Sequence, residues 1–117
     1  MAFKFEKLNV WQRSLDFSVE VYELTNKFPK QEMFGLTSQI NRAADSISLN
    51  IAEGSTGQSN AEFSKFLGYS IRSGIEVVGC LYIAKKKKFI TQDEFNYHYT
   101  AAESIIVMNQ ALRKKLR

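Results

Sequence analysis

Cysteine, proline and histidine each occur once in this 117-residue sequence, and their scarcity excludes several classes of protein. Cys80 alone cannot form an internal disulfide or a four-cysteine zinc site. His98 alone excludes most histidine-rich metal centres. No apolar run approaches the ~18 residues that a membrane span needs, and the first residues lack the apolar core of a secretory signal. We therefore expect a cytoplasmic protein with no cofactor, no metal site and no membrane contact.

The overall composition is that of an ordinary globular protein. Hydrophobic residues make up 44% of the sequence and charged residues 24%, which excludes disorder, collagen-like repeats and a disulfide-rich scaffold. A chain of this length has room for one compact domain. We expect a single domain over residues 1–117.

Breaks in the helical pattern are few, so an all-α fold is predicted. Pro29 cannot extend a helix from within, and Gly54 and Gly57 mark the other clear loop. No stretch alternates cleanly for about five residues between turn signals, which argues against strands. The expected helices span about residues 9–28, 36–53, 60–86 and 92–115.

Two capping boxes support the starts of the third and fourth helices. Ser59 precedes Glu62, and Thr91 precedes Glu94, by the three positions at which each side chain can cap the other's backbone amide. The connections between helices are about four to eight residues long, which suits antiparallel neighbours. We therefore predict an antiparallel up-down-up-down four-helix bundle.

The apolar faces of these helices are wider than one bundle core requires. On the first helix, two apolar stripes together cover roughly 220°, against the ~100° that one buried face needs. One stripe consists of Val10, Phe17, Val21, Leu24 and Phe28, and the other of Trp11, Leu15, Val19 and Tyr22. Exposed apolar surface of this extent usually marks an interaction site, so we predict a homo-oligomer. The alternative is a small monomeric bundle whose aromatic residues half cover its grooves.

A polar seam borders the narrow apolar stripe of the second helix. Its members recur every three or four residues: Gln39, Arg42, Ser46, Asn50 and Glu53. The third helix offers Arg72 and Glu76, one turn apart, as charged partners. The seam is interpreted either as a hydrogen-bonded interface with a helix, subunit or ligand, or as an ordinary solvated flank.

Small and polar residues interrupt the third and fourth helices. Gly68, Gly74 and Gly79 each cost up to about 1 kcal/mol relative to alanine inside a helix, which close approach of another helix would explain. Asn109 lies within the apolar arc of the fourth helix, where a buried asparagine can fix register or oligomeric state. His98 lies in the same arc and is interpreted as a structural histidine.

The constellations that would indicate an enzyme are incomplete. A di-iron bundle needs two Glu-x-x-His motifs, whereas Glu94 and His98 are four apart and no second histidine exists. Cys80 stands among small and apolar neighbours and is interpreted as a buried residue rather than a nucleophile. Residues 54–57 lack the spacing and the lysine of a phosphate-binding loop. We therefore expect a protein that is not an enzyme.

Two basic clusters end the third and fourth helices. They consist of Lys85, Lys86, Lys87 and Lys88, and of Arg113, Lys114, Lys115 and Arg117. The helix dipole favours cations at helix C-termini, which is the simplest explanation for both clusters. In a cyclic assembly each cluster would be repeated around a ring, and such a ring attracts phosphate backbones without reading sequence. Because the net charge is only +4, binding of RNA or DNA is expected to be weak and sensitive to salt.

Three segments carry a resemblance to a known family. They are LNVW at residues 8–11, FPKQEMFGLTSQINRAA at 28–44, and SISLNIAEG at 46–54. The chain resembles, over nearly its whole length, the four-helix-bundle proteins encoded in intervening sequences of bacterial 23S ribosomal RNA genes. The most specific part is NIAEG at residues 50–54. Residues 70–76 keep the arginine and glutamate of the family pattern but order serine and glycine differently.

The resemblance implies a short antiparallel four-helix bundle that assembles as a barrel-like homopentamer. A related protein, the accessory variability protein of diversity-generating retroelements, is a strongly basic pentamer that binds nucleic acid and a reverse transcriptase. Members of the intervening-sequence family have no established activity. Our leading hypothesis is a non-enzymatic homo-oligomeric scaffold that binds RNA or DNA weakly through its basic helix ends. The alternatives are a protein-interaction module with an unidentified protein partner, and an enzyme that uses the polar seam as a pocket.

Overall fold

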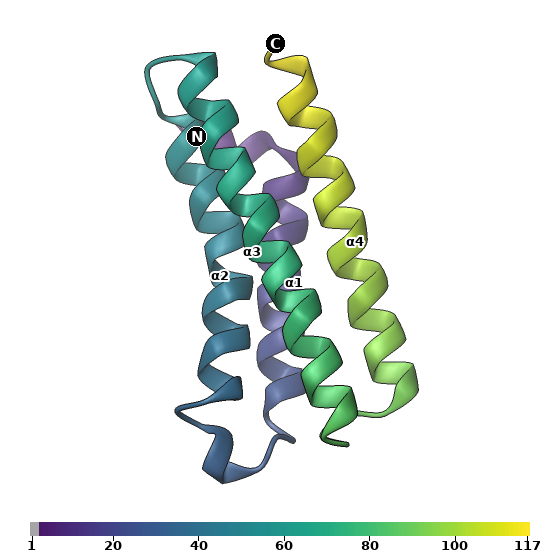
Figure 1. Cartoon of the computed structure of the whole chain (residues 1–117). Helices are drawn as coiled ribbons and strands as arrows, with labels where there is room; N and C mark the ends of the chain where they lie inside the picture. Colours follow the sequence, from purple (N-terminus) through teal and green to yellow (C-terminus); the bar gives the residue numbers. More distant parts are fainter. Residues whose placement is uncertain (1–2) are drawn as a thin grey trace.

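The computed structural model describes residues 3–117, and all regular structure in that part of the chain is helical. The four α-helices run alternately up and down (Figure 1). They are α1 (Asn9–Thr25), α2 (Leu36–Ser55), α3 (Asn60–Lys86) and α4 (Gln92–Lys115). Two short 3-10 helices, η1 (Lys4–Lys7) and η2 (Lys30–Glu32), precede α1 and α2. Helices that follow one another in sequence pack together, and α4 also contacts α1. The prediction of an all-α, up-down four-helix bundle is confirmed.

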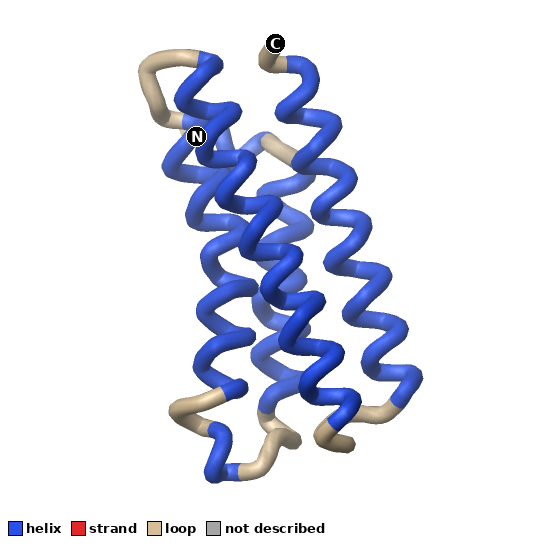
Figure 2. Tube along the Cα trace, in the orientation of Figure 1, coloured by secondary structure: helices blue, strands red, loops and turns tan. Residues whose placement is uncertain are grey.

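The bundle is elongated, with extents of 43 × 21 × 21 Å. The C-terminus and the α2–α3 connection lie at one end, and the α1–α2 and α3–α4 connections lie at the other (Figure 2). None of the helices within residues 3–117 is long and apolar enough to cross a membrane.

One apolar core runs along the bundle and receives side chains from every helix. Its fully buried members include Phe17, Val21, Ile40, Ile47, Ile51, Leu67, Val77, Leu81 and Ile105. Burial of one side chain of this size stabilises the folded protein by roughly 1.5–3 kcal/mol. Of the two stripes expected on α1, the one that contains Phe17 is the one that enters the core.

Two helix ends differ from the expected positions. α1 ends at Thr25 instead of Phe28, because the chain turns there and Phe28 packs its ring against Phe89, with 5.6 Å between the centroids. α2 continues through Gly54 to Ser55. A Cβ at Gly54 would stand 2.5 Å from Cβ of Phe66. Gly54 therefore allows α3 to approach α2, and the expectation that it lies in the loop after the helix is wrong.

The capping box that opens α4 is complete, and the one that opens α3 is half formed. The amide of Glu94 donates to Oγ1 of Thr91 at 3.1 Å, and the amide of Thr91 donates to Oε1 of Glu94 at 2.8 Å. The amide of Glu62 donates to Oγ of Ser59 at 3.1 Å. The carboxylate of Glu62 lies beside Gly57 instead of returning to Ser59.

The three glycines inside α3 have three different surroundings. A Cβ at Gly74 would stand 2.9 Å from Cγ1 of Ile106, so the expected close approach of a helix is confirmed there. At Gly68 the neighbour is the guanidinium of Arg113, whose Nη2 would be 3.1 Å away. A Cβ at Gly79 would meet nothing within 4 Å, so no helix of the described chain approaches it.

Candidate functional site

The polar seam of α2 faces α3 along one groove of the bundle. Nε2 of Gln39 donates to Oε2 of Glu76 at 3.5 Å, and Oγ of Ser46 donates to Oγ of Ser73 at 2.5 Å. Asn50 instead donates to the carbonyl of Ser46 on its own helix at 2.8 Å. The seam is therefore bonded to α3 at two points.

The other seam residues remain in solvent. Arg42, Glu53 and Arg72 are exposed, and within residues 3–117 none of the three makes a side-chain hydrogen bond or an ion pair. Of the two charged partners expected on α3, only Glu76 reaches the seam. Ser73 was missed, although its position one turn before Glu76 was a signal that could have identified it.

A groove of about 600 Å³ opens over part of this seam. It is lined by Phe34, Gly35, Ser38, Gln39, Arg42, Ala43, Ser46 and Glu76. Phe34 is 93% exposed. The lining contains no histidine, cysteine or lysine, and within the described residues neither of its serines is bonded to a carboxylate. The groove can therefore recognise a polar segment, but it does not hold a nucleophile paired with a base.

A second polar contact, not predicted from the sequence, lies inside the core. Oγ of Ser70 on α3 donates to the carbonyl of Ile47 on α2 at 2.9 Å. Nδ2 of Asn109 on α4 donates to Oγ of Ser70 at 3.1 Å. Ser70 and Asn109 are both fully buried, which confirms the core position of Asn109. One chain of hydrogen bonds thus joins three helices.

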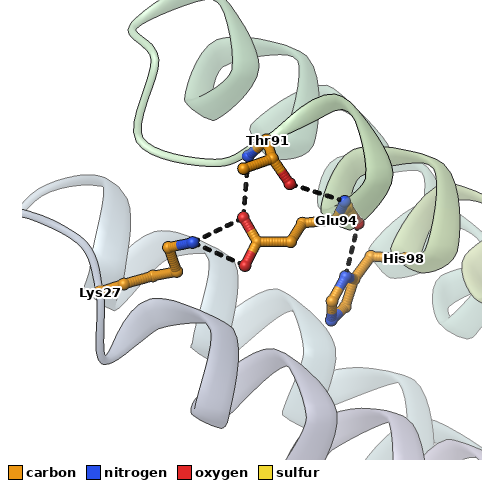
Figure 3. A network of polar contacts seen from close by, with 4 residues as sticks. All are labelled: Lys27, Thr91, Glu94 and His98. Atoms are coloured by element: carbon orange, nitrogen blue, oxygen red, sulfur yellow. Dashed lines mark hydrogen bonds and ion pairs between the residues drawn. The ribbon is translucent and has the colours of Figure 1, made fainter.

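His98 belongs to a network of polar contacts near the connection between α3 and α4, with Lys27, Thr91 and Glu94 (Figure 3). Its Nδ1 lies 2.7 Å from the carbonyl oxygen of Glu94, so Nδ1 carries the proton. The carboxylate of Glu94 accepts from Nζ of Lys27 at 2.6 and 2.7 Å. These hydrogen bonds from Lys27, and a further one from the amide of Thr91, hold the pKa of Glu94 below its usual range. His98 is also buried, as expected of a structural histidine.

Cys80 is a buried thiol. It is 2% exposed, and burial, with a smaller contribution from Glu76, raises its pKa to about 11. It is therefore a poor nucleophile at neutral pH, in agreement with its interpretation as a small core residue. Among residues 3–117 no group of three or more His, Cys, Asp or Glu side chains could hold a metal ion.

Two of the four lysines at the end of α3 contact neighbouring side chains. Nζ of Lys85 stands 4.1 Å from the ring centroid of Phe95, a cation–π contact. Nζ of Lys87 lies 4.0 Å from Oε2 of Glu32. Lys86 is exposed and makes no such contact within the described chain.

Lys88 has a structural role at the end of the same helix. Its φ of 67° places it in the left-handed region. The amide of Lys88 donates to the carbonyl of Lys85 at 3.0 Å, and the amide of Phe89 donates to that of Ala84 at 2.9 Å. This is the Schellman pattern that ends many helices, usually with glycine at the left-handed position.

The basic residues at the end of α4 form a groove. Arg113, Lys114 and Arg117 line it together with Ile71 and Gln110, and its volume is about 410 Å³. Lys115 faces a different, smaller groove between α1 and α4. The ends of α3 and α4 lie at opposite ends of the bundle (Figure 1). The structure therefore brings together three of the eight basic residues considered as nucleic-acid contacts, and keeps the lysines of α3 apart from them.

Apolar side chains remain exposed on two sides of the bundle. The α1–α2 apolar face consists of Leu15, Val19, Tyr22 and Leu49, which are between 41 and 64% exposed. The α3 outer face consists of Ile75, Gly79 and Ile83, with the two isoleucines 56 and 44% exposed. Trp11, the remaining member of the second α1 stripe, is partly buried against Phe5.

Comparisons with known proteins identify related sequences and a related fold. The sequence profile of the family described as 23S rRNA-intervening sequence protein matches residues 6–111. No curated protein matches the chain. A similar solved structure is that of a protein of unknown function from the S23 ribosomal protein family of Bacteroides thetaiotaomicron, with a TM-score of 0.83 and 24% identity. The match covers 90% of this chain and 95% of that one. At this identity the likeness shows a shared fold.

Proposed function

Because this chain belongs to the 23S rRNA-intervening sequence protein family, we propose that it is a non-enzymatic cytoplasmic scaffold that assembles with copies of itself and binds RNA or DNA through basic helix ends. The observation that carries the proposal is the groove lined by Arg113, Lys114 and Arg117. No carboxylate is among its lining residues. Such a groove attracts phosphates by its charge. When it binds them, counterions condensed on the nucleic acid are released, and the base sequence is not read.

Self-association is supported by the two exposed apolar faces. The α1–α2 apolar face follows the groove between those helices, where Val19 and Tyr22 stand beside Asn41 and Asp45. Leu49 lies one turn beyond Asp45 on the same side of α2. The α3 outer face lies on another side of the bundle, since α3 is in front and α1 behind in Figure 1. Contact between two different faces is head-to-tail, and such contacts form a ring when the rotation from one subunit to the next closes.

Gly79 supports a partner on the α3 outer face. A glycine inside a helix costs up to about 1 kcal/mol relative to alanine. Nothing in the described chain stands within 4 Å of where its Cβ would be. A helix of a second copy that packs closely at Gly79, between Ile75 and Ile83, explains the absence of a side chain. The family resemblance implies five copies, with a mass of about 67 kDa, five times the 13.4 kDa of one chain.

Light scattering of the purified protein tests both halves of the proposal. We expect an assembly of about 67 kDa, five times 13.4 kDa, that gains mass from a mixed RNA pool at low salt and loses it at high salt. Val19→Glu and Gly79→Gln should each reduce the mass of the protein alone. Glu103→Gln, at an exposed position of α4 outside both faces, should not. A wild-type monomer would contradict the scaffold, and an assembly indifferent to RNA would contradict nucleic-acid binding.

The α2–α3 groove favours a second candidate function, a protein-interaction module. The groove presents an exposed aromatic ring, one cation and one anion, from Phe34, Arg42 and Glu76. These groups suit a peptide segment of mixed polarity better than a phosphate backbone. Capture of a single protein partner that resists high salt and is lost in Arg42→Ala would favour this function over nucleic-acid binding.

A further inference from the structure

We infer that nucleic acid binds at the end of α4 and not at the end of α3, and that Gly68 leaves the room in which Ser64 holds Arg113 as a positioned phosphate-binding residue. The inference rests on the proposed function and names its site. The ligand is the phosphodiester backbone of an RNA or DNA strand, because the groove offers cationic and amide donors and no ring on which a base could stack. Arg113, Lys114 and Arg117 supply the charge, and Gln110 supplies an amide.

Arg113 is held in place from α3. Its Nε donates to Oγ of Ser64 at 3.2 Å. Its guanidinium lies against Gly68, where an added Cβ would stand 3.1 Å from Nη2, 3.2 Å from Cζ and 3.4 Å from Nη1. A larger side chain at position 68 would therefore occupy the place of the guanidinium. The glycine explains how an arginine from α4 can lie flat on the backbone of α3.

Fixing Nε leaves the two terminal nitrogens of Arg113 to bind a ligand. A guanidinium presents its donors as a rigid fork that matches two oxygens of one phosphate. When the fork is already oriented, less side-chain entropy is lost on binding. Lys114, on α4, and Arg117, just after the end of α4, line the same groove as Arg113, so they add charge around this fork.

The end of α3 lacks these properties. Lys85 is placed over the ring of Phe95, and Lys87 faces the carboxylate of Glu32. Lys88 serves the helix end through its left-handed backbone. The acidic first turn of α4, with Asp93 and Glu94, lies at the same end of the bundle. An incoming phosphate would therefore compete with existing partners at Lys85 and Lys87 and meet nearby carboxylates.

Fluorescence anisotropy with a labelled single-stranded RNA, and with DNA of the same sequence, tests the inference. Titrations at about 50 and 200 mM salt give the affinity and its salt dependence. Arg113→Gln should weaken binding roughly three- to tenfold and reduce the salt slope by about 0.7. Gly68→Gln keeps every charge and should still weaken binding, because it displaces the guanidinium. Ala61→Gln, at an exposed position of the same end of α3, is the matched control.

Arg113→Lys keeps the charge without the fork, and it covers the case in which Gly68→Gln does not fold. It should bind more weakly than wild type at both salt concentrations. RNA and DNA should bind alike, since the phosphate is their common group, and Lys86→Gln should bind as wild type does.

The inference fails if Gly68→Gln and Arg113→Lys both match wild type, or if Lys86→Gln is as weak as Arg113→Gln. In those cases the wild type still binds RNA and the proposed function survives. If the wild type itself binds neither strand at low salt, the proposed function and the inference fall together.

Discussion

Asn109 on α4 donates a hydrogen bond of 3.1 Å to Ser70 on α3, and both side chains are fully buried. Ser70 in turn donates to the carbonyl of Ile47 on α2. Oδ1 of Asn109 has no hydrogen-bond partner among residues 3–117. Buried polar contacts of this kind align helices relative to one another at a cost in stability, because an unsatisfied polar atom loses its hydration.

Removal of the Ser70 hydroxyl should expose the coupling between these two residues. Ser70→Ala leaves the amide of Asn109 without its acceptor, so we expect a loss of about 1–3 kcal/mol in the free energy of unfolding. In an Asn109→Leu background the same change should cost less, because no buried amide remains to be satisfied. Urea unfolding of the four proteins of this cycle measures the difference. Additive effects would show that the two side chains do not depend on each other.

Replacement of Lys88 by glycine should stabilise the folded protein. Its φ of 67° is costly for a residue with a Cβ and free for glycine. Lys88→Gly should therefore raise the free energy of unfolding by about 1 kcal/mol. Lys86→Gly removes the same charge within the last turn of the helix and should lower it by up to about 1 kcal/mol. Thermal unfolding of the pair checks the prediction, and a loss of stability in both would contradict it.

The helix starts could be predicted because their signals are local. The hydroxyl of Thr91 and the carboxylate of Glu94 each accept a hydrogen bond from the backbone amide of the other residue, three positions away, as their spacing indicated. The core stripe of α1 followed from helical periodicity alone. The end of α1 could not be predicted to the residue, because Phe28 leaves the helix for a partner ring, Phe89, that is distant in sequence.

The parts of the site that depend on distant partners could not be predicted. The acceptor of Ser70 is the backbone carbonyl of Ile47, a group that every residue type carries. The contact of Gly68 with Arg113 joins two helices and depends on how they lean together. The run of four lysines looked uniform, yet its members have different roles, set by ring contacts, by an acidic neighbour and by the backbone angle of Lys88.

Glu94 should make the fold sensitive to acid. Its hydrogen bonds with Lys27 and the Thr91 amide lower its pKa in the folded protein. A carboxylate with a depressed folded pKa contributes stability above its unfolded pKa of about 4.3, and loses it as the pH falls through the folded value. The difference in unfolding free energy between wild type and Glu94→Gln should therefore narrow below about pH 4.3.

Lys27→Met provides the control for this titration, since it removes the largest cause of the shift. In the Lys27→Met background, the change in unfolding free energy that Glu94→Gln causes should depend less on pH. Chemical denaturation from about pH 3 to 7 covers the relevant range. Parallel curves for wild type and Glu94→Gln over that range would show that the Lys27–Glu94 contact does not contribute in solution.

Gly74 should not tolerate alanine, although alanine favours helix. The added Cβ would stand 2.9 Å from Cγ1 and 3.3 Å from Cδ1 of Ile106. Overpacking of this kind costs about 1–3 kcal/mol, against a gain of about 1 kcal/mol in helix propensity. Gly74→Ala should therefore leave the protein no more stable than wild type. In an Ile106→Ala background, where the obstructing atoms are gone, the same substitution should stabilise the protein by about 1 kcal/mol. Thermal unfolding of all four proteins separates the overpacking from the gain in helix propensity. An equal gain in stability from Gly74→Ala in both backgrounds would mean that Ile106 of α4 does not come as close to position 74 as the 2.9 Å distance implies.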